Sequence, residues 1–376
     1  MKRLIDICDI QYGYAFDSMC FTEDSSYPQL VRIRDVKRGY SETYYSGNYP
    51  EEYILSEGDL LVGMDGEFNI ARWKSSGALL NQQVCKLIAK VGINGEYIRF
   101  AMTKALKEIE RKTAFVTVKH LSAKELNKLE LDVPKLSEQD RIADTLNRLE
   151  KVIEARQEEL DKLDDLIKAR FVELFGNPLD ETAKYPIHQV RKIANLVDPQ
   201  PSHRTPPIDE DGIPYVSIKD CDYKTGKIDF EGARKVSRKV LEEHLNRYTL
   251  QDGDFVIGKI GTIGNPVFVP VRDDYTLSAN VVLVQPNSEL VSPYFLKYSF
   301  ESDFVERQFA EAKKSTSQAA FGIQKVRTIE VMNPDLSVQR GFEDFVKQVD
   351  KSKVAVQKAL DETQMLFDSL MQKYFA

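Results

Sequence analysis

The sequence predicts an α+β protein in which one plan is used twice: a mixed α/β domain followed by a long helix, then a second such domain and a second long helix. Three observations lead to this fold class. A heptad pattern of apolar residues in 142–174 returns two hundred positions later, several motifs before the helices recur in the same order, and Gly176 and Pro178 mark the end of the first copy. The length agrees, because 376 residues suit two domains better than one core.

The two long helices are predicted from apolar residues spaced alternately four and three positions apart, with charged residues between them. A sustained repeat of this kind is typical of helices that pair along a narrow stripe. Basic residues interrupt the seams in different layers, at Arg156, Arg170 and Lys353, where they can set the register at some cost in stability. The seam residues are Leu146, Leu149, Ile153, Leu160, Leu163, Ile167 and Leu174 in the first helix and Val346, Val349, Val356, Leu360, Phe367 and Leu370 in the second.

A duplicated chain implies a pseudo-twofold axis, and this symmetry predicts how the helices pair. Two helices related by such an axis are expected to pair antiparallel. The expected architecture is therefore two pseudo-symmetric mixed α/β domains, separated by two long helices that form an antiparallel coiled coil. The alternative is a pair of surface helices that lie on separate cores.

Several motifs recur in both halves of the chain, and four of them indicate particular elements. The first alternates apolar and polar residues, as a half-buried strand does. The second is a Gly-Asp turn that leads into an apolar strand and then a glycine loop, and the third opens a short amphipathic helix. In the fourth, a proline ends the sheet and a serine, Ser137 or Ser337, is placed to cap the long helix. The motif pairs are 30–35 and 215–220, 55–63 and 250–258, 97–100 and 294–297, and 134–139 and 334–339.

Several classes of protein are excluded by what the sequence lacks. No apolar run approaches the ~18 residues that a membrane span needs, so we expect a cytoplasmic protein with no membrane partner. The four cysteines show no C-x-x-C spacing, and the glycine loops do not have the dinucleotide spacing, so no metal, disulfide or cofactor is predicted. The double proline in 205–208 lacks the neighbours of a DNA methyltransferase loop, and Asp254 is interpreted as a turn residue, so no catalytic site is expected.

The charge distribution bears on the partner. Net charge is −7, and much of the deficit lies in 137–175, which carries seven basic and eleven acidic residues. The two domains are close to neutral, so the protein alone should bind phosphate weakly. Nevertheless, two related modules at a fixed separation suit duplex DNA, whose strands are antiparallel and whose half-sites recur along the helix. If the protein works on DNA, a partner is expected to supply part of the electrostatic attraction.

The order of domains and helices, the L-x-[DE]-G-D strand with its glycine loop, and the P-x-L-S-x-Q start of each long helix resemble the specificity (S) subunit of type I restriction-modification systems. The resemblance covers nearly the whole chain, and its strength lies in the double occurrence of each motif. It implies two target recognition domains that each read half of a bipartite, asymmetric DNA site, and two helices that set the spacing. The corresponding ranges are 1–136 and 179–336 for the recognition domains, and 137–178 and 337–376 for the helices.

The same resemblance implies the partners. They are double-stranded DNA, two methyltransferase (M) subunits and, through them, restriction (R) subunits, while the S subunit is not itself an enzyme. A coiled-coil adaptor whose two modules bind protein is the alternative function.

Candidate DNA-binding residues lie in three kinds of stretch. Glycine loops allow close approach of the backbone to phosphate, arginines after the first strand can read guanine, and later loops mix hydroxyls and amides with lysines. Arg32 and Arg34 are expected on one face of a strand, and Trp73 suits the core at least as well as DNA. The structural alternatives are a tight turn, a solvated sheet edge and a solvated loop. The predicted set is Arg32, Arg34, Lys37, Arg38, Gly66, Asn69, Lys74, Thr113, Thr117 and Lys119 in the first domain and Ser217, Lys219, Lys259, Gly261, Thr262, Asn265, Lys314, Thr316 and Gln318 in the second.

Overall fold

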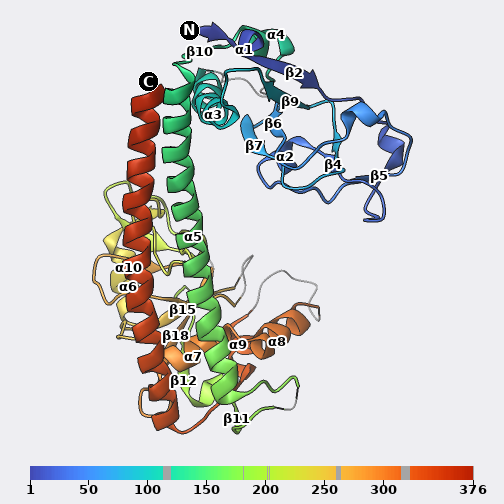
Figure 1. Cartoon of the computed structure of the whole chain (residues 1–376). Coiled ribbons are helices and arrows are strands. Elements are labelled where there is room, and N and C mark those ends of the chain that lie inside the picture. Colours follow the sequence, from blue (N-terminus) through green and yellow to red (C-terminus); the bar gives the residue numbers. More distant parts are fainter. Residues whose placement is uncertain are drawn as a thin grey trace. The chain divides into compact units, whose positions relative to one another are not determined.

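The structure of the chain, a computed structural model, describes residues 1–112, 120–180, 182–200, 202, 204–259, 264–314 and 322–375 (Figure 1). It divides into two compact units. Unit 1 is Met1–Gln157 together with Lys358–Ala376, and unit 2 is Glu158–Gln357. Each unit contains one globular module and part of both long helices.

The module of unit 1 is a mixed α/β domain. Its elements are β1 (Lys2–Arg3), α1 (Leu4–Ile7), β2 (Cys8–Tyr12), η1 (Ser18–Cys20), β3 (Phe21–Thr22), β4 (Leu30–Val31), α2 (Ile33–Val36), β5 (Tyr44–Tyr45), η2 (Glu51–Tyr53), β6 (Leu60–Gly63), β7 (Asn69–Arg72), β8 (Leu79–Leu80), β9 (Val84–Ala89), α3 (Gly95–Lys112), α4 (Ala123–Lys128) and β10 (Glu130–Leu131). The main sheet is antiparallel, with the strand order β2-β9-β6-β7. Beside it, β4 and β8 pair in parallel and β1 pairs with β10.

The module of unit 2 repeats this plan. Its elements are β11 (Ile187–Gln189), η3 (Val190–Lys192), β12 (Ala194–Val197), β13 (Ile213–Val216), η4 (Ile218–Asp220), β14 (Lys235–Val236), α6 (Arg238–Leu245), β15 (Phe255–Gly258), β16 (Val267–Phe268), β17 (Thr276–Leu277), β18 (Val281–Pro286), α7 (Pro293–Phe300), α8 (Asp303–Lys314), α9 (Ile323–Thr328) and β19 (Glu330–Met332). The main sheet has the order β12-β18-β15-β16, and β13 pairs with β17 in parallel. Register is kept as well, because Leu60 pairs with Leu87 and Phe255 with Val284. The predicted duplication is thus confirmed.

The first repeated motif is not the six-residue strand that its alternation predicts. Strand β4 ends at Val31, and Arg32 is the N-cap of the short helix α2, which begins at Ile33. In the second module β13 ends at Val216, and Ser217 is the N-cap of η4. The cause is an aspartate three residues on. Asp35 Oδ2 accepts a hydrogen bond from Arg32 N at 2.9 Å, and Asp220 Oδ2 accepts one from Ser217 N at 2.8 Å. This capping closes a helical turn, so the prediction that Arg32 and Arg34 share a strand face is wrong.

The fourth motif works through its glutamine, not its serine. Helices α5 (Leu136–Phe175) and α10 (Leu336–Phe375) begin one residue before the serines, so Ser137 and Ser337 are not caps. Gln139, 1% exposed, accepts from Asn94 N at 2.9 Å and donates to the Pro134 carbonyl at 2.8 Å. Gln339, 0% exposed, accepts from Ser292 N at 2.7 Å and donates to the Pro334 carbonyl at 2.7 Å. Each glutamine therefore joins its long helix to the start of α3 or α7.

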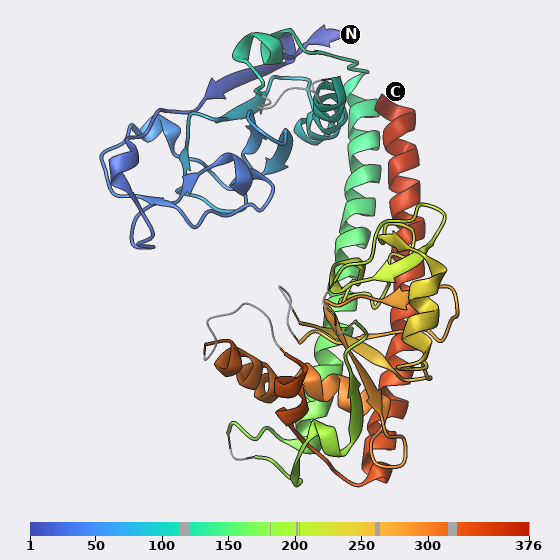
Figure 2. The same ribbon diagram turned by 180° about the vertical axis from the view of Figure 1, so that it is seen from behind.

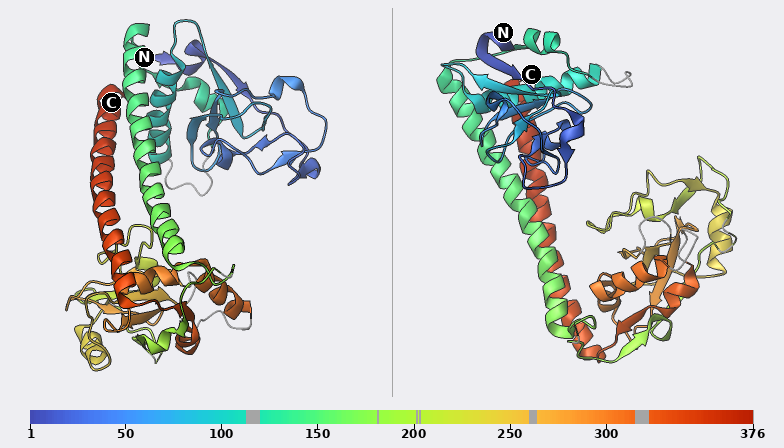
Figure 3. Two further views of the ribbon diagram at one scale, coloured as in Figure 1. Left: turned by 60° about the horizontal axis from the view of Figure 1, so that its bottom comes forward. Right: turned by 90° about the vertical axis from the view of Figure 1, so that its right-hand side faces the viewer.

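The long helices pair antiparallel within each unit, as predicted (Figures 2 and 3). In unit 2, Asp164 Oδ1 lies 2.5 Å from Lys353 Nζ and the rings of Phe171 and Phe342 are 5.5 Å apart, so the residue number rises along α5 as it falls along α10. In unit 1, Arg141 near the start of α5 lies over the ring of Tyr374 near the end of α10. The predicted seam positions are all buried or partly buried. No helix among the described residues is long and apolar enough to cross a membrane.

Each module shares one core with the helix pair. In unit 2 the cluster includes Ile167, Phe171 and Phe342 together with Phe295 of α7, whose ring stacks on Phe171 at 5.6 Å. The same positions recur in unit 1, where Ile142, Leu146 and Met371 share a cluster with residues of α3. The helices are therefore part of both domain cores.

A buried polar network lies in unit 2 beneath α6. His244, 3% exposed, places Nδ1 2.7 Å from Thr276 Oγ1 and Nε2 2.5 Å from Gln200 Oε1. Tyr248 OH lies 3.1 Å from the same Thr276 hydroxyl. Burial lowers the pKa of His244 below its ordinary value of 6.5; Arg247 also lowers it and Glu243 raises it. Neutral His244 thus belongs to the folded state.

Two neighbouring residues of α5 test the seam. Ile167 is fully buried, whereas Leu166 is 47% exposed. We expect Ile167→Ala to lower the free energy of unfolding by about 2–5 kcal/mol, because it leaves a cavity in a shared core. Leu166→Ala, the matched control, should change it by less than about 0.5 kcal/mol. Urea denaturation measures both, and equal effects would show that the seam is not where the structure places it.

His244 makes the stability of the protein depend on pH. Because its folded-state pKa lies below 6.5, the unfolded chain binds a proton more readily, so stability is full above pH 6.5 and falls as the pH drops through that value. Urea denaturation at about pH 7.5 and about pH 5.5 should show this loss. In His244→Gln, which does not titrate, the difference between the two conditions should shrink. A variant with the same pH dependence as the unmodified protein would rule out this role of His244.

Candidate nucleic-acid interface

The predicted basic stretch of module 1 lies in the short helix α2 and in the residues directly after it. Arg34 belongs to α2, Lys37 and Arg38 follow it, and all three side chains are exposed. Asp35 is 2% exposed and is held by its bond to Arg32 N, so the turn is anchored from inside while its basic residues face solvent. Arg32, also exposed, precedes this turn.

The structure brings this stretch to the first glycine loop, as the sequence could not show. Lys37 Nζ lies 3.8 Å from Glu67 Oε1 of the loop. Gly39 adopts a left-handed conformation, φ 77°, and a Cβ there would lie 2.6 Å from the Lys74 side chain, which passes over the glycine. Lys37 and Glu67 are each about three-quarters exposed, so the attraction between them is weak, and Lys37 is free to exchange Glu67 for phosphate.

Gly66 lies in the loop between β6 and β7, and Asn69 is the first residue of β7. Gly66, at φ 68°, is exposed and has nothing within 4 Å of the place a Cβ would take. Asn69 Nδ2 donates to the Glu67 carbonyl at 2.9 Å, whereas its buried Oδ1 has no hydrogen-bond partner among the described residues. Next to them Asp65 pairs with His120, which joins this loop to the chain that follows 113–119. The predicted basic stretch of module 1 and the chain that follows 113–119 thus both contact the first glycine loop.

In module 2 the glycine loop starts differently. Lys259 is 4% exposed, and its Nζ lies 2.8 Å from Asp198 Oδ1. The two groups form an ion pair, and among the described residues Lys259 Nζ donates no hydrogen bond. The expectation that Lys259 is a free DNA contact is corrected, because its charge is already neutralised inside the module. The pairing of β12 with β18 and of β15 with β18 makes Met64 and Tyr12 the equivalent residues of module 1, and both belong to an apolar cluster.

Ser217 is also placed inside. It is 6% exposed, and its hydroxyl donates to Asp220 Oδ2 at 2.8 Å. Ser217 closes the turn of η4, as Arg32 closes that of α2 in module 1. The assignment of Ser217 to the DNA-binding set is therefore corrected. Lys219, the next basic residue, is exposed.

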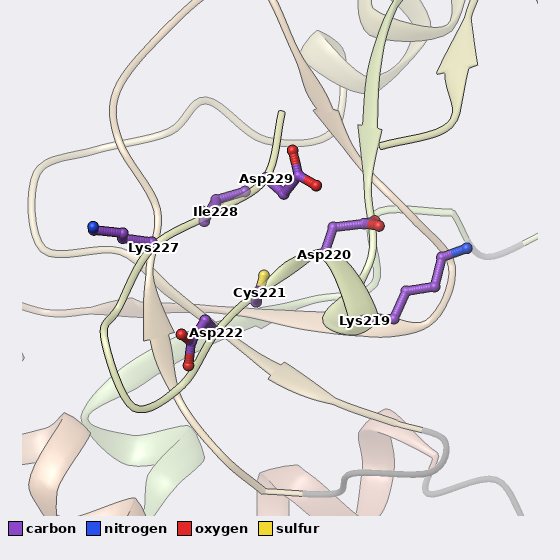
Figure 4. Close-up of a pocket in the computed structure, with 7 residues that line it drawn as sticks. All are labelled: Lys219, Asp220, Cys221, Asp222, Lys227, Ile228 and Asp229. Carbon is purple, nitrogen blue, oxygen red and sulfur yellow. The ribbon is translucent and has the colours of Figure 1, made fainter. Parts of the chain in front are cut away.

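A shallow hollow follows η4, and Figure 4 shows its seven lining residues. Lys219 and Lys227 extend from opposite sides of it, and Asp222 caps the turn between them by accepting from Thr225 Oγ1 at 2.7 Å. Burial raises the pKa of the Cys221 thiol at its floor to about 12, so that thiol stays protonated and unreactive. The hollow is therefore a turn lined by two lysines and three aspartates.

The described residues of the stretch from Asp198 to Pro206 were not singled out as a site from the sequence. Gln200 Nε2 donates to Ser202 Oγ at 2.9 Å and to the Arg204 carbonyl at 3.2 Å, and Arg234 Nη2 donates to the Pro206 carbonyl at 2.6 Å. Ser202 and Arg204 are exposed. The available signal was a proline-rich stretch with interspersed polar residues, which resembles a plain loop.

Several predicted contacts lie outside the described residues: Thr113, Thr117, Lys119, Gly261, Thr262, Thr316 and Gln318, and the side chain of Lys314. Asn265 is partly buried and Lys74 is exposed. Trp73 is 1% exposed and belongs to a core cluster, which settles it as a packing residue.

The interpretation of Asp254 as a turn residue is confirmed. It is 2% exposed, and its Oδ2 accepts from Gln251 N at 2.9 Å and from Gln285 Nε2 at 2.7 Å. Burial raises the pKa of its carboxyl group, while the bond from Gln285 opposes the rise. In the part of the chain that the structure describes, no group of three or more His, Cys, Asp or Glu residues could hold a metal ion.

Comparison with known proteins agrees with this geometry. The family model of the type I restriction modification DNA specificity domain matches residues 1–164 and 210–363. The chain is 27% identical to the type I restriction enzyme EcoBI specificity subunit of Escherichia coli, with 98% of this chain and 84% of that protein aligned. It is 22% identical to the MjaVIII specificity subunit of Methanocaldococcus jannaschii, with 82% and 78% aligned.

Solved structures share the fold. The type I restriction-modification S subunit from M. genitalium superposes with a TM-score of 0.59 at 15% identity, over 100% of this chain and 95% of that one. A chain from a structural study of complex assembly and conformational transition of the type I restriction-modification system gives a TM-score of 0.52 at 14% identity, over 100% and 96%. Because the family model covers most of both repeats, the chain belongs to the type I restriction-modification DNA specificity family.

Proposed function

We propose that this chain is the non-catalytic subunit that sets the DNA sequence specificity of a type I restriction-modification complex. Each module reads one half of a bipartite, asymmetric site in double-stranded DNA. The single observation that carries the proposal is the match of the specificity family to both repeats. The duplicated fold supports it, because it supplies two related but chemically different surfaces.

The recognition surfaces we propose are those assembled around each glycine loop. In module 1 they comprise the turn of Arg34, Lys37 and Arg38 with Gly66 and Asn69. Exposed arginine and lysine there suit base and phosphate contact. In module 2, Lys219, Asn265 and the segments on either side of them take this role. The predicted residues outside the described ranges stay in the proposal.

The proposed partners follow from charge and from family membership. A chain with a net charge of −7 should bind DNA weakly alone. Two methyltransferase subunits are therefore expected to dock on it and to supply both the chemistry and further phosphate contacts, with restriction subunits attached through them. We take 1–136 and 179–336 as the recognition domains, joined by the helical ranges 137–178 and 337–376.

A module exchange tests the division of labour. Replacing residues 1–136 by the corresponding domain of another family member should change one half of the methylated site and leave the other half and the spacing unchanged. Sequencing of methylated DNA, in a host that carries the methyltransferase partner, reads the result. The host without this gene is the control and should lack the motif. A protein-binding adaptor predicts no change in any DNA motif, and that outcome would overturn the proposal.

The paired helices are proposed as the spacer, and their register shows how to test it. With Arg141 against Tyr374 and Asp164 against Lys353, Ile153 faces the stretch near Glu362. Seven residues inserted after both Ile153 and Asp361 keep the seams and lengthen each helix by about 10 Å. The methylated site should then have a longer spacer.

The control for this experiment replaces residues 154–160 by the same seven residues without changing the length, and it should leave the spacing unaltered. A folded insertion variant that still methylates the original site, with its original spacing, would show that the helices do not measure the distance.

A further inference from the structure

In the second module, Arg204 is exposed and lies in the stretch 198–206, whose described residues are held by three interactions. Asp198, the residue after β12, forms the buried ion pair with Lys259. Gln200 bonds to His244, itself 3% exposed. Pro206 receives the hydrogen bond from Arg234. Between these points Ser202 and Arg204 face solvent.

The first of these interactions brings the start of this stretch to Lys259, the residue that precedes the glycine loop. Asp198 begins the stretch and Lys259 immediately precedes 260–263, and their charged atoms are 2.8 Å apart. A lysine–carboxylate pair this deeply buried is costly to form and costly to break on one side. Asp198 and Lys259 are therefore held together at the base of module 2.

The second of these interactions holds the backbone at Arg204 in place. The Gln200 amide uses its oxygen for His244 and its nitrogen for Ser202 Oγ and for the Arg204 carbonyl, so one side chain joins the buried network to the exposed residues. Among the described residues, no carboxylate or carbonyl pairs with the Arg204 guanidinium. A positioned backbone with an unpaired guanidinium is suited to bidentate recognition, because less conformational entropy is lost on binding.

We propose that Arg204 is a specificity-determining residue of the second half-site, and that Gln200 positions it. The proposal rests on the proposed function and adds a segment to it. Arginine reads guanine through O6 and N7 in the major groove, so the expected target is a guanine of the second half-site.

The experiment uses the assembled complex with its methyltransferase partner, and compares Arg204→Ala, Arg204→Lys and Arg191→Ala. Arg191 is an exposed arginine of η3 in the same module, so its loss removes the same charge. We expect Arg204→Ala to bind the intact site about 5- to 150-fold more weakly and to lose the identity of one base pair in the second half-site. Arg204→Lys should also lose the identity of that base pair, because lysine lacks the planar guanidinium group that can make two parallel hydrogen bonds.

The role of Gln200 is tested in the same assay. Gln200→Ala should relax the same base pair, and it should have no further effect on that base pair in an Arg204→Ala background, since it acts through Arg204. A Gln200 variant that only destabilised the fold would weaken binding to every sequence and would leave base selectivity intact.

The outcomes separate the two proposals. If the unmodified complex has no bipartite site, the proposed function fails and this inference fails with it. If that site exists but Arg204→Ala behaves like Arg191→Ala, or Arg204→Lys restores full selectivity, Arg204 contacts at most phosphate and only the inference is overturned.

Discussion

The antiparallel pairing of α5 and α10 is the constraint on which the rest of the structure depends. In each unit the first half of one long helix packs against the last half of the other, and the module core closes over both. Ile142 and Leu146 with Met371 in unit 1 correspond to Phe342 and Val346 with Phe171 in unit 2. Each module core therefore includes the end of the other repeat's long helix as well as the start of its own.

The buried glutamine at the start of each helix converts this packing into a defined orientation. A glutamine that both accepts from a helix start and donates to the carbonyl of a proline leaves little rotational freedom at the joint. Arg99 reinforces the joint in unit 1, since it bonds to Glu150 and Asn147 of α5. A spacer can set the distance between recognition surfaces only if each module is held rigidly to it. These hydrogen bonds hold the module to the long helices within each unit.

The two modules differ in chemistry where each glycine loop begins. Module 1 places Met64 and Tyr12 there, in an apolar cluster, whereas module 2 places the Lys259–Asp198 pair. Burial also raises the pKa of the Tyr12 hydroxyl, in keeping with its apolar setting. The backbone topology is kept while the chemistry at the loop base changes. A duplicated reader that recognises two unlike half-sites requires this combination.

The sequence by itself determined the duplication and the two heptad seams, because periodicity and repeated motifs can be read from the order of the residues alone. It also placed Asp254 correctly, since a Gly-Asp turn is a short-range feature. It could not determine that Lys259 and Ser217 are inside, that Gln139 and Gln339 rather than two serines secure the helices, or that the turn of Lys37 meets the loop of Glu67. Those facts depend on contacts between residues far apart in the chain. Only the tertiary structure decides which charges face each other and which face water.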